Sequence, residues 1–208
     1  MQWGSSNHTS SKWVLSLSHD MSSRETMGVY KSTAGKDFDL ILQRLKDCTL
    51  QAGNPFLLPM LILQEELNHI GERQRRIRVE VRRIEDALGL RNGLQASTHP
   101  FTFVNGNVDF DFLNREIVET SAQLLKRRPC TYLEVLDDLE AAMNIYEAAI
   151  PNHSGDIAEI HAILMSRLKF QQKTVQAMER YHQVTTGRLN AQINAVSNYA
   201  SCDIELDG

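Results

Sequence analysis

Residues 157–198 read IAEIHAILMSRLKFQQKTVQAMERYHQVTTGRLNAQINAVSN, and this stretch decides the fold. It contains no proline and a single glycine, Gly187, so no strong helix-ending signal interrupts it. We predict one helix from Asp156 to about Tyr199, which at about 1.5 Å per residue would extend roughly 65 Å. A lone helix of that length cannot bury its own apolar side chains. It therefore requires a partner helix, either in this chain or in another.

An apolar stripe along this helix defines a predicted helix–helix contact seam. The seam residues are Leu164, Leu168, Gln171, Val175, Met178, His182, Leu189, Ile193 and Val196. The polar residues at or near the stripe are Gln171, His182, Thr185 and Gln192. In coiled coils, polar seam residues set the register and the oligomeric state at a cost in stability. Two compatible arrangements fit the stripe: a coiled coil with another chain, or packing on the preceding helices within 109–150.

The remainder of the chain predicts a mainly α fold, a multi-helix bundle with a small N-terminal β element. Alternation at Trp13–Ser18 indicates a strand, and Met27–Tyr30 is its expected partner across a polar turn. Four helices are expected before the long one: from Asp37 to near Gly53, from Asn54 to Leu88, from Asp109 to Arg127, and from Thr131 to Ile150. Gly89 is a natural stop for the second of these helices, and Pro129 closes the third.

The predicted organisation has four parts. Residues 1–11 are expected to be disordered, 12–153 to form a mainly helical domain, 154–199 to form the stalk-like helix, and 200–208 to form a polar tail. Within the helical domain, 89–107 reads as a linker with a short strand at Phe101–Val104.

The composition excludes several classes of protein. The chain has 208 residues, of which 42% are apolar and 23% charged, as in ordinary globular proteins. Its net charge of −4 argues against a general nucleic-acid binder. The N-terminus lacks the apolar core of a signal peptide, and the longest apolar run, Pro55–Leu63, is too short to span a bilayer. We predict a cytoplasmic protein without a transmembrane span, associated with a membrane only through a partner or through peripheral contact.

Candidate chemistry in the sequence is weak. Glu66 and His69 have the Glu-x-x-His spacing of di-iron bundles, but such a centre needs a second motif, and the chain has none. An exposed polar helix face is the expected alternative for Glu65, Glu66 and His69. No nucleophile, base and orienting residue form a recognisable set. We therefore predict no catalytic residue, no metal site and no cofactor, and a protein that is not an enzyme.

A run of arginines is the densest charge feature of the chain. On a helix its members are expected to spread around the circumference and to pair with interspersed acidic residues three or four positions away. The alternative is contact with an acidic partner or with anionic lipid headgroups. The run comprises Arg73, Arg75, Arg76, Arg78, Arg82 and Arg83.

Several stretches resemble the cytosolic part of the fungal CorA-like divalent metal ion (Mg²⁺) transporter family. They are WVLSLSHD at 13–20, GVY at 28–30, NPFLLPM at 54–60, RLKFQQKTVQ at 167–176, GRLN at 187–190 and QINAV at 192–196. In that family a similar long helix leads to the first membrane helix. The family's two transmembrane segments and its Gly-Met-Asn loop have no counterpart in this sequence. The resemblance therefore implies neither transport nor named metal-binding residues, and it is the sole basis for considering Mg²⁺.

These observations lead to two functional hypotheses. In the first, the chain is equivalent to the cytosolic domain and stalk of a CorA-like transporter. It would act through helix–helix association with itself or with related full-length subunits, and would be unable to transport ions alone. In the second, it is a stand-alone coiled-coil or helical-bundle adaptor with no connection to ion transport.

Overall fold

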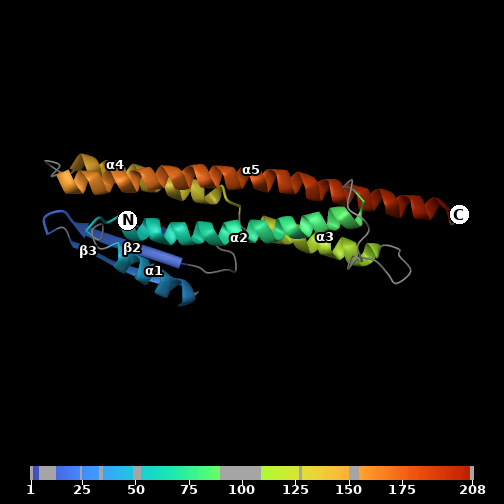
Figure 1. The fold of residues 1–208 in the computed structure, drawn as a ribbon, viewed down its shortest axis with the longest axis horizontal. Helices are drawn as coiled ribbons and strands as arrows, with labels where there is room; N and C mark the ends of the chain where they lie inside the picture. The colour runs from blue at the N-terminus through green and yellow to red at the C-terminus, as the bar shows by residue number, and fades with distance from the viewer. Residues whose placement is uncertain are drawn as a thin grey trace. The chain divides into compact units, whose positions relative to one another are not determined.

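The computed structural model describes residues 2–4, 13–23, 25–32, 35–48, 53–89, 109–126, 128–149 and 155–206. Its described part is mainly helical with a small N-terminal sheet, which confirms the predicted fold class (Figure 1). Contacts divide the chain into two compact units: unit 1 comprises Met1–His69 and Cys130–Gln176, and unit 2 comprises Ile70–Pro129 and Ala177–Gly208. The predicted linker strand at 101–104 lies outside the described residues.

A three-stranded antiparallel sheet opens unit 1. Its strands are β1 (Gln2–Gly4), β2 (Trp13–Asp20) and β3 (Glu25–Ser32), with β2 in the middle. The two predicted strands are confirmed. Gln2–Gly4, within the segment 1–11 that we expect to be disordered, pair with the edge of β2 that β3 leaves open.

Gly28 of β3 lies opposite Leu17 of β2. A Cβ atom at this position would come within 2.5 Å of the backbone oxygen of Ser16 and would also collide with Leu17. A residue with a side chain therefore cannot fit there without moving the strand.

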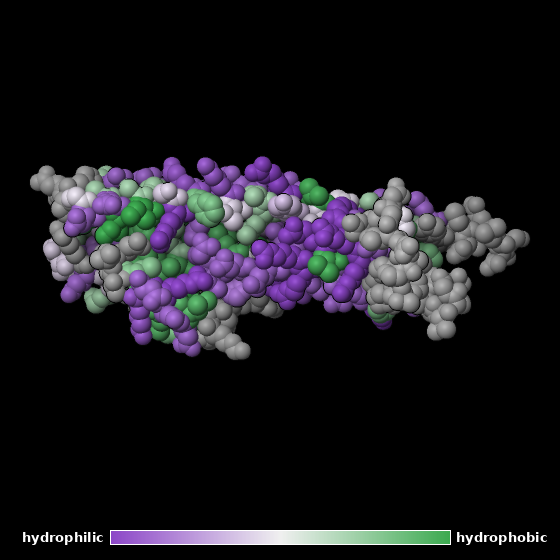
Figure 2. Space-filling view, in the orientation of Figure 1, coloured by the Kyte–Doolittle hydropathy of each residue, from purple (hydrophilic) through white to green (hydrophobic). Residues whose placement is uncertain are grey.

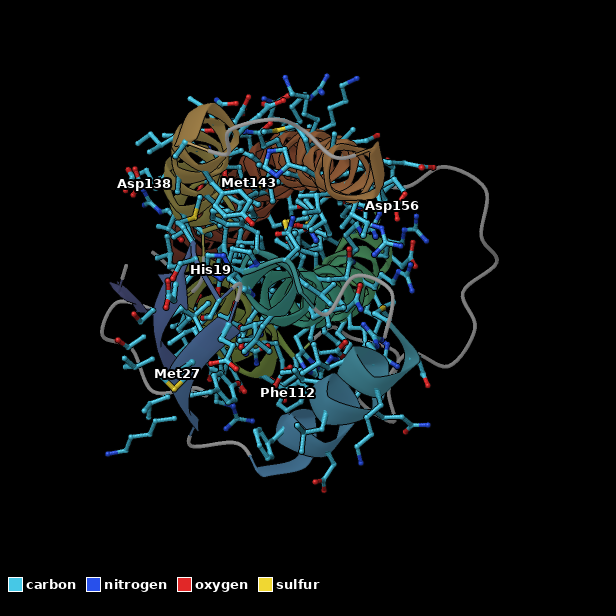
Figure 3. All side chains as sticks on the ribbon, turned by 90° about the vertical axis from the view of Figure 1, so that its left-hand side faces the viewer. His19, Met27, Phe112, Asp138, Met143 and Asp156 are labelled. Carbon is cyan, nitrogen blue, oxygen red and sulfur yellow. The ribbon has the colours of Figure 1, made fainter. Side chains whose placement is uncertain are left out.

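Unit 1 also contains α1 (Gly35–Asp47), α4 (Thr131–Ala149) and the first parts of α2 (Leu57–Ala87) and α5 (Gly155–Leu206). α1 ends before the predicted Gly53. α4 and α5 run antiparallel, because Glu140 lies against Gln172 whereas Glu147 lies against His161. In the end-on view Met143 lies inside the helical layer, where it is fully buried, and exposed Asp138 lies on its outer side (Figure 3).

Unit 2 is formed by α3 (Phe110–Leu125) with the second parts of α2 and α5. Asp109 caps α3 by accepting a 2.9 Å hydrogen bond from the backbone N–H of Phe112. α2 and α3 run antiparallel, since one core cluster joins the end of α2 to the start of α3 and a second joins earlier α2 to the end of α3. The clusters are Ile84, Leu88, Leu113 and Ile117, and Ile77, Val81, Leu124 and Leu189.

The ends of the long helices follow local backbone chemistry. Gly89 follows α2 with a φ of 65°, the left-handed conformation expected of a glycine stop. α5 continues to Leu206, beyond the predicted end at Tyr199 and through most of the predicted polar tail. Residues 199–206 contain neither proline nor glycine, so the backbone has no reason to leave the helix where the apolar stripe ends.

Candidate functional site

The buried face of α5 follows a coiled-coil repeat. Successive seam residues are separated by alternating steps of three and four, which average the 3.5 residues of a heptad pattern. They are His161, Leu164, Leu168, Gln171 and Val175 in unit 1, and Met178, His182, Thr185, Leu189 and Gln192 in unit 2. All are buried except Met178, which is half-buried.

Of the predicted seam residues, Ile193 departs from this pattern, whereas Val196 continues it by a step of four from Gln192. Ile193 is 40% exposed, and Gln192 takes the fully buried position beside it, because a step of three from Leu189 reaches 192. Val196 is half-buried and packs against the cluster at the end of α2. Hydrophobicity alone favours Ile193 as the seam residue, whereas the spacing of the repeat identifies Gln192 as the buried residue at this point of α5.

In unit 1 the seam contacts α2 and α4 of the same chain. The Gln171 amide donates to the backbone oxygen of Met60 at 3.3 Å and to Gln64 Oε1 at 3.1 Å. The Gln172 amide donates to Glu140 at 2.7 Å, and this hydrogen bond is the main cause of a lowered pKa at Glu140. Lys169, 3.4 Å from the same carboxylate, acts in the same direction.

In unit 2 the seam contacts α2 of the same chain again. The Gln192 amide donates to the backbone oxygen of Val81 at 3.0 Å, and the Gln74 amide donates to that of Met178 at 3.0 Å. From the first of these contacts to the second, the residue number rises on α2 from 74 to 81 and on α5 from 178 to 192. The two helices therefore run parallel in unit 2. The described contacts of the seam are thus internal to the chain. A coiled coil with a second chain stays a prediction.

His182 makes unit 2 sensitive to pH. Burial lowers its pKa, while the neighbouring Glu179 partly opposes the shift. The folded state therefore disfavours the protonated ring, and the unfolded chain binds the proton more readily below about pH 6.5. Stability should fall as the pH drops from about 6.5 toward the folded pKa, and it should be unaffected above that range.

We expect a His182→Gln variant to lose part of this acid sensitivity, because glutamine does not titrate. The measurement is the melting temperature of both proteins between pH 8 and pH 5. The difference in melting temperature between the two proteins should change below about pH 6.5 and stay constant above it. Parallel curves over the whole range would contradict the assignment.

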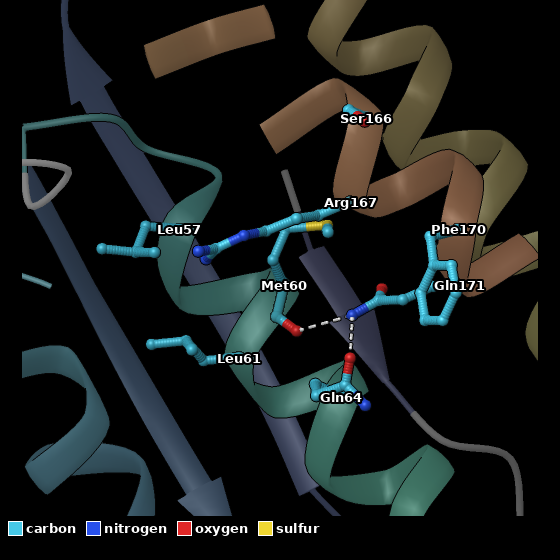
Figure 4. Close-up of a pocket in the computed structure, with 8 residues that line it drawn as sticks. All are labelled: Leu57, Met60, Leu61, Gln64, Ser166, Arg167, Phe170 and Gln171. Carbon is cyan, nitrogen blue, oxygen red and sulfur yellow. Dashed lines mark hydrogen bonds between the residues drawn. The ribbon is translucent and has the colours of Figure 1, made fainter. Parts of the chain in front are cut away.

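A groove in unit 1 remains open between α2 and α5, with a cavity volume of about 500 Å³ (Figure 4). Its lining residues are Leu57, Met60, Leu61, Gln64, Ser166, Arg167, Phe170 and Gln171. The three apolar residues from α2 are buried by the fold, whereas the Phe170 side chain is 68% exposed. The pair of hydrogen bonds from Gln171 closes one side of the groove and fixes the spacing of the two helices there.

The acidic residues of α2 are not exposed as predicted. Glu65 and Glu66 are 8% and 6% exposed, because partners far away in the sequence cover them. Arg44 lies 2.9 Å from the Glu65 carboxylate, and the Tyr132 hydroxyl donates to Glu66 at 3.4 Å. His69 is half-buried, with its ring 4.0 Å from Glu65. The described residues contain no group of three or more side chains able to hold a metal ion.

The arginine run divides into exposed and half-buried members. Its four exposed members share one side of α2 with the 46% exposed Val79, opposite the buried residues Ile77, Val81 and Ile84. These four are Arg75, Arg76, Arg82 and Arg83. Hydrophilic residues cover much of this part of α2 (Figure 2).

The other two arginines of the run, Arg73 and Arg78, are half-buried. Arg78 lies 5.0 Å from the ring centre of Tyr181. Of the expected neighbouring ion pairs, Arg83 lies 3.1 Å from Glu80. Glu85 instead binds Arg188 of α5 through two hydrogen bonds of 2.7 and 2.5 Å.

Comparisons with protein-family models, with curated proteins and with solved structures found no match to this chain. Among the described helices, none combines the length and the apolar character needed to cross a bilayer. The resemblance to CorA-like proteins thus stays a prediction, as does the expectation that the chain is not an enzyme.

Proposed function

We propose that this protein is a helical scaffold that acts by helix–helix association, with itself or with a related subunit. The observation that supports the proposal is the open groove of unit 1, with Phe170 exposed at its wall. The seam of α5 is already filled by helices of the same chain, so an incoming helix must use another face. The groove is a face that α2 and α5 leave uncovered.

The shape of the groove suits a helix that inserts apolar side chains. On α2 the lining residues Leu57, Met60, Leu61 and Gln64 follow the i, i+3, i+4, i+7 spacing of one helix face. An amphipathic helix that docks in an apolar groove inserts its own anchors at this same spacing, so its apolar face would lie against this face of α2. Phe170 would become buried on docking, and exposed aromatic residues of this kind commonly dominate binding energy.

Two forms of this function are compatible with the groove. In one, the chain is the cytosolic and stalk part of a CorA-like assembly, and the incoming helix belongs to another subunit. In the other, it is an adaptor unrelated to ion transport. The quoted sequence similarities favour the first form, and they carry no implication of transport by this chain.

A Phe170→Asp variant should associate at least tenfold more weakly than the wild type, because a carboxylate replaces the apolar anchor. Its melting temperature should change little, since the side chain is exposed within the single chain. The measurement is sedimentation equilibrium over a range of protein concentrations. Val184→Asp is the matched control, because Val184 is 61% exposed on the same helix and does not line the groove. A monomeric wild type, or equal effects of both variants, would overturn self-association through the groove.

A further inference from the structure

A second cleft in unit 1 lies at the start of α2, and it shares no lining residue with the groove. Its volume is about 360 Å³, within the lower range of small-molecule sites. Three elements distant in the sequence form it: β2, the turn before α2, and α4. The lining residues are Leu17, Ser18, His19, Met21, Pro55, Phe56, Ala142, Ile145, Tyr146 and Ala149. We call it the aromatic cleft.

Tyr146 is the centre of a cluster of aromatic rings at this cleft. Its ring centre lies 5.5 Å from that of His19 and 5.4 Å from that of Phe56, both nearly perpendicular to it. The buried His161 ring lies behind it at 5.8 Å. Edge-to-face contacts of this kind hold the rings in fixed orientations. The walls are therefore set before any ligand arrives.

The backbone around Phe56 is fixed as well. Asn54 is 7% exposed, and its side-chain oxygen accepts a 3.0 Å hydrogen bond from the Phe56 N–H. The backbone oxygen of Asn54 accepts a second hydrogen bond from the Leu57 N–H at 3.2 Å. This turn places Phe56 against Tyr146 just before α2 begins.

Small residues on α4 leave the space next to Tyr146 empty. Ala142 and Ala149 lie four residues before and three residues after Tyr146, on the same helix face. Ile145, which is 67% exposed, adds apolar surface on this part of α4. A larger side chain at either alanine would occupy space that the cleft now offers.

The polar groups of the cleft are few. The Nδ1 atom of His19 lies 2.9 Å from the Thr26 hydroxyl, which fixes the imidazole and leaves Nε2 for another partner. Ser18 adds a hydroxyl group. The ten lining residues include no carboxylate, so a cationic ligand would lose its hydration without an ion-pair partner in the cleft.

We propose that the aromatic cleft binds a small, uncharged aromatic compound of one or two fused rings that carries a hydrogen-bonding group. The ring packs against the exposed faces of the Tyr146 and Phe56 pair, and its polar group meets His19 or Ser18. This site is independent of helix docking at the groove, so either proposal can fail without the other.

The test is a titration of the ¹⁵N-labelled full-length chain with phenol, and separately with cyclohexanol, followed by NMR. The two compounds have the same number of heavy atoms, but only phenol is aromatic. We expect phenol to shift the amide signals of Ser18, Phe56 and Tyr146 and to bind at least fivefold more tightly than cyclohexanol. An Ala149→Leu variant should weaken phenol binding at least tenfold.

The matched control is Ala148→Leu, an equally conservative change at an exposed neighbour outside the cleft. It should leave phenol binding unchanged. The proposal is overturned by equal affinity for phenol and cyclohexanol, by shifts confined to other parts of the chain, or by equal effects of the two leucine variants. It is equally overturned if millimolar phenol leaves those three amide signals unmoved.

Discussion

A Leu168→Asp variant should fail to form the helical core of unit 1 at neutral pH. Leu168 is fully buried in the seam of α5, and removing its side chain alone would cost about 2–5 kcal/mol. Burying a carboxylate without a partner adds several kcal/mol more. The sum approaches the whole stability of a typical domain, about 5–15 kcal/mol. Far-ultraviolet circular dichroism and urea unfolding at pH 7 would measure the loss.

The control is the Phe170→Asp variant, which introduces the same carboxylate two residues away at an exposed position. It should remain folded. The sequence alone placed Leu168 in the predicted helix–helix contact seam. The structure assigns stability to Leu168 and leads us to assign association to Phe170. A Leu168→Asp protein that melts within about two degrees of the wild type would contradict the described packing.

An Arg188→Met variant should lose about 2–3 kcal/mol of unfolding free energy in unit 2. Glu85, whose side chain is 12% exposed, would lose both hydrogen bonds from the guanidinium while remaining largely shielded from water. The same hydrogen bonds raise the pKa of Arg188, which shows that the folded state favours its charged form. Removing one partner of a shielded ion pair lowers the stability more than replacing both partners, because it leaves the other charge uncompensated.

The double variant Glu85→Leu with Arg188→Met should therefore recover much of the lost stability. Urea unfolding of the wild type, both single variants and the double variant completes the thermodynamic cycle. We expect a coupling energy between the two residues above about 1 kcal/mol. It should be smaller than that of a fully buried ion pair, because solvent screens the partly exposed Arg188. Strictly additive effects would mean that the pair contributes nothing to unit 2.

The long helix could be predicted because its evidence is local. An uninterrupted run without proline, with apolar residues at heptad spacing, determines α5 and most of its seam. Ile193 is exposed within the single chain, because the spacing that begins at Leu189 brings position 192 to the buried face. Gln192 is buried in its place, and its hydrogen bond to the Val81 backbone offsets part of the desolvation of its amide.

The environment of the charged residues could not be predicted, because it depends on partners distant in the sequence. Glu65 is shielded from water by Arg44 on α1, and Glu66 by Tyr132 on α4. Glu85 pairs across to α5 instead of with a neighbouring arginine. The aromatic cleft is a feature of the same kind, since its three walls come from β2, the turn before α2, and α4. No local pattern in the sequence connects those segments.

The parallel arrangement of α2 and α5 has a consequence for how the protein is made. The contacting residues are 111 positions apart for Met60 and Gln171, and 104 apart for Gln74 and Met178. At about 5–20 residues per second, a ribosome takes roughly 5–20 s to synthesise that interval. Throughout this time the apolar face of α2 has left the exit tunnel, or is leaving it, before its α5 partner has been translated. The part of α2 that contacts α5 should therefore stay uncovered in newly made chains until translation reaches α5.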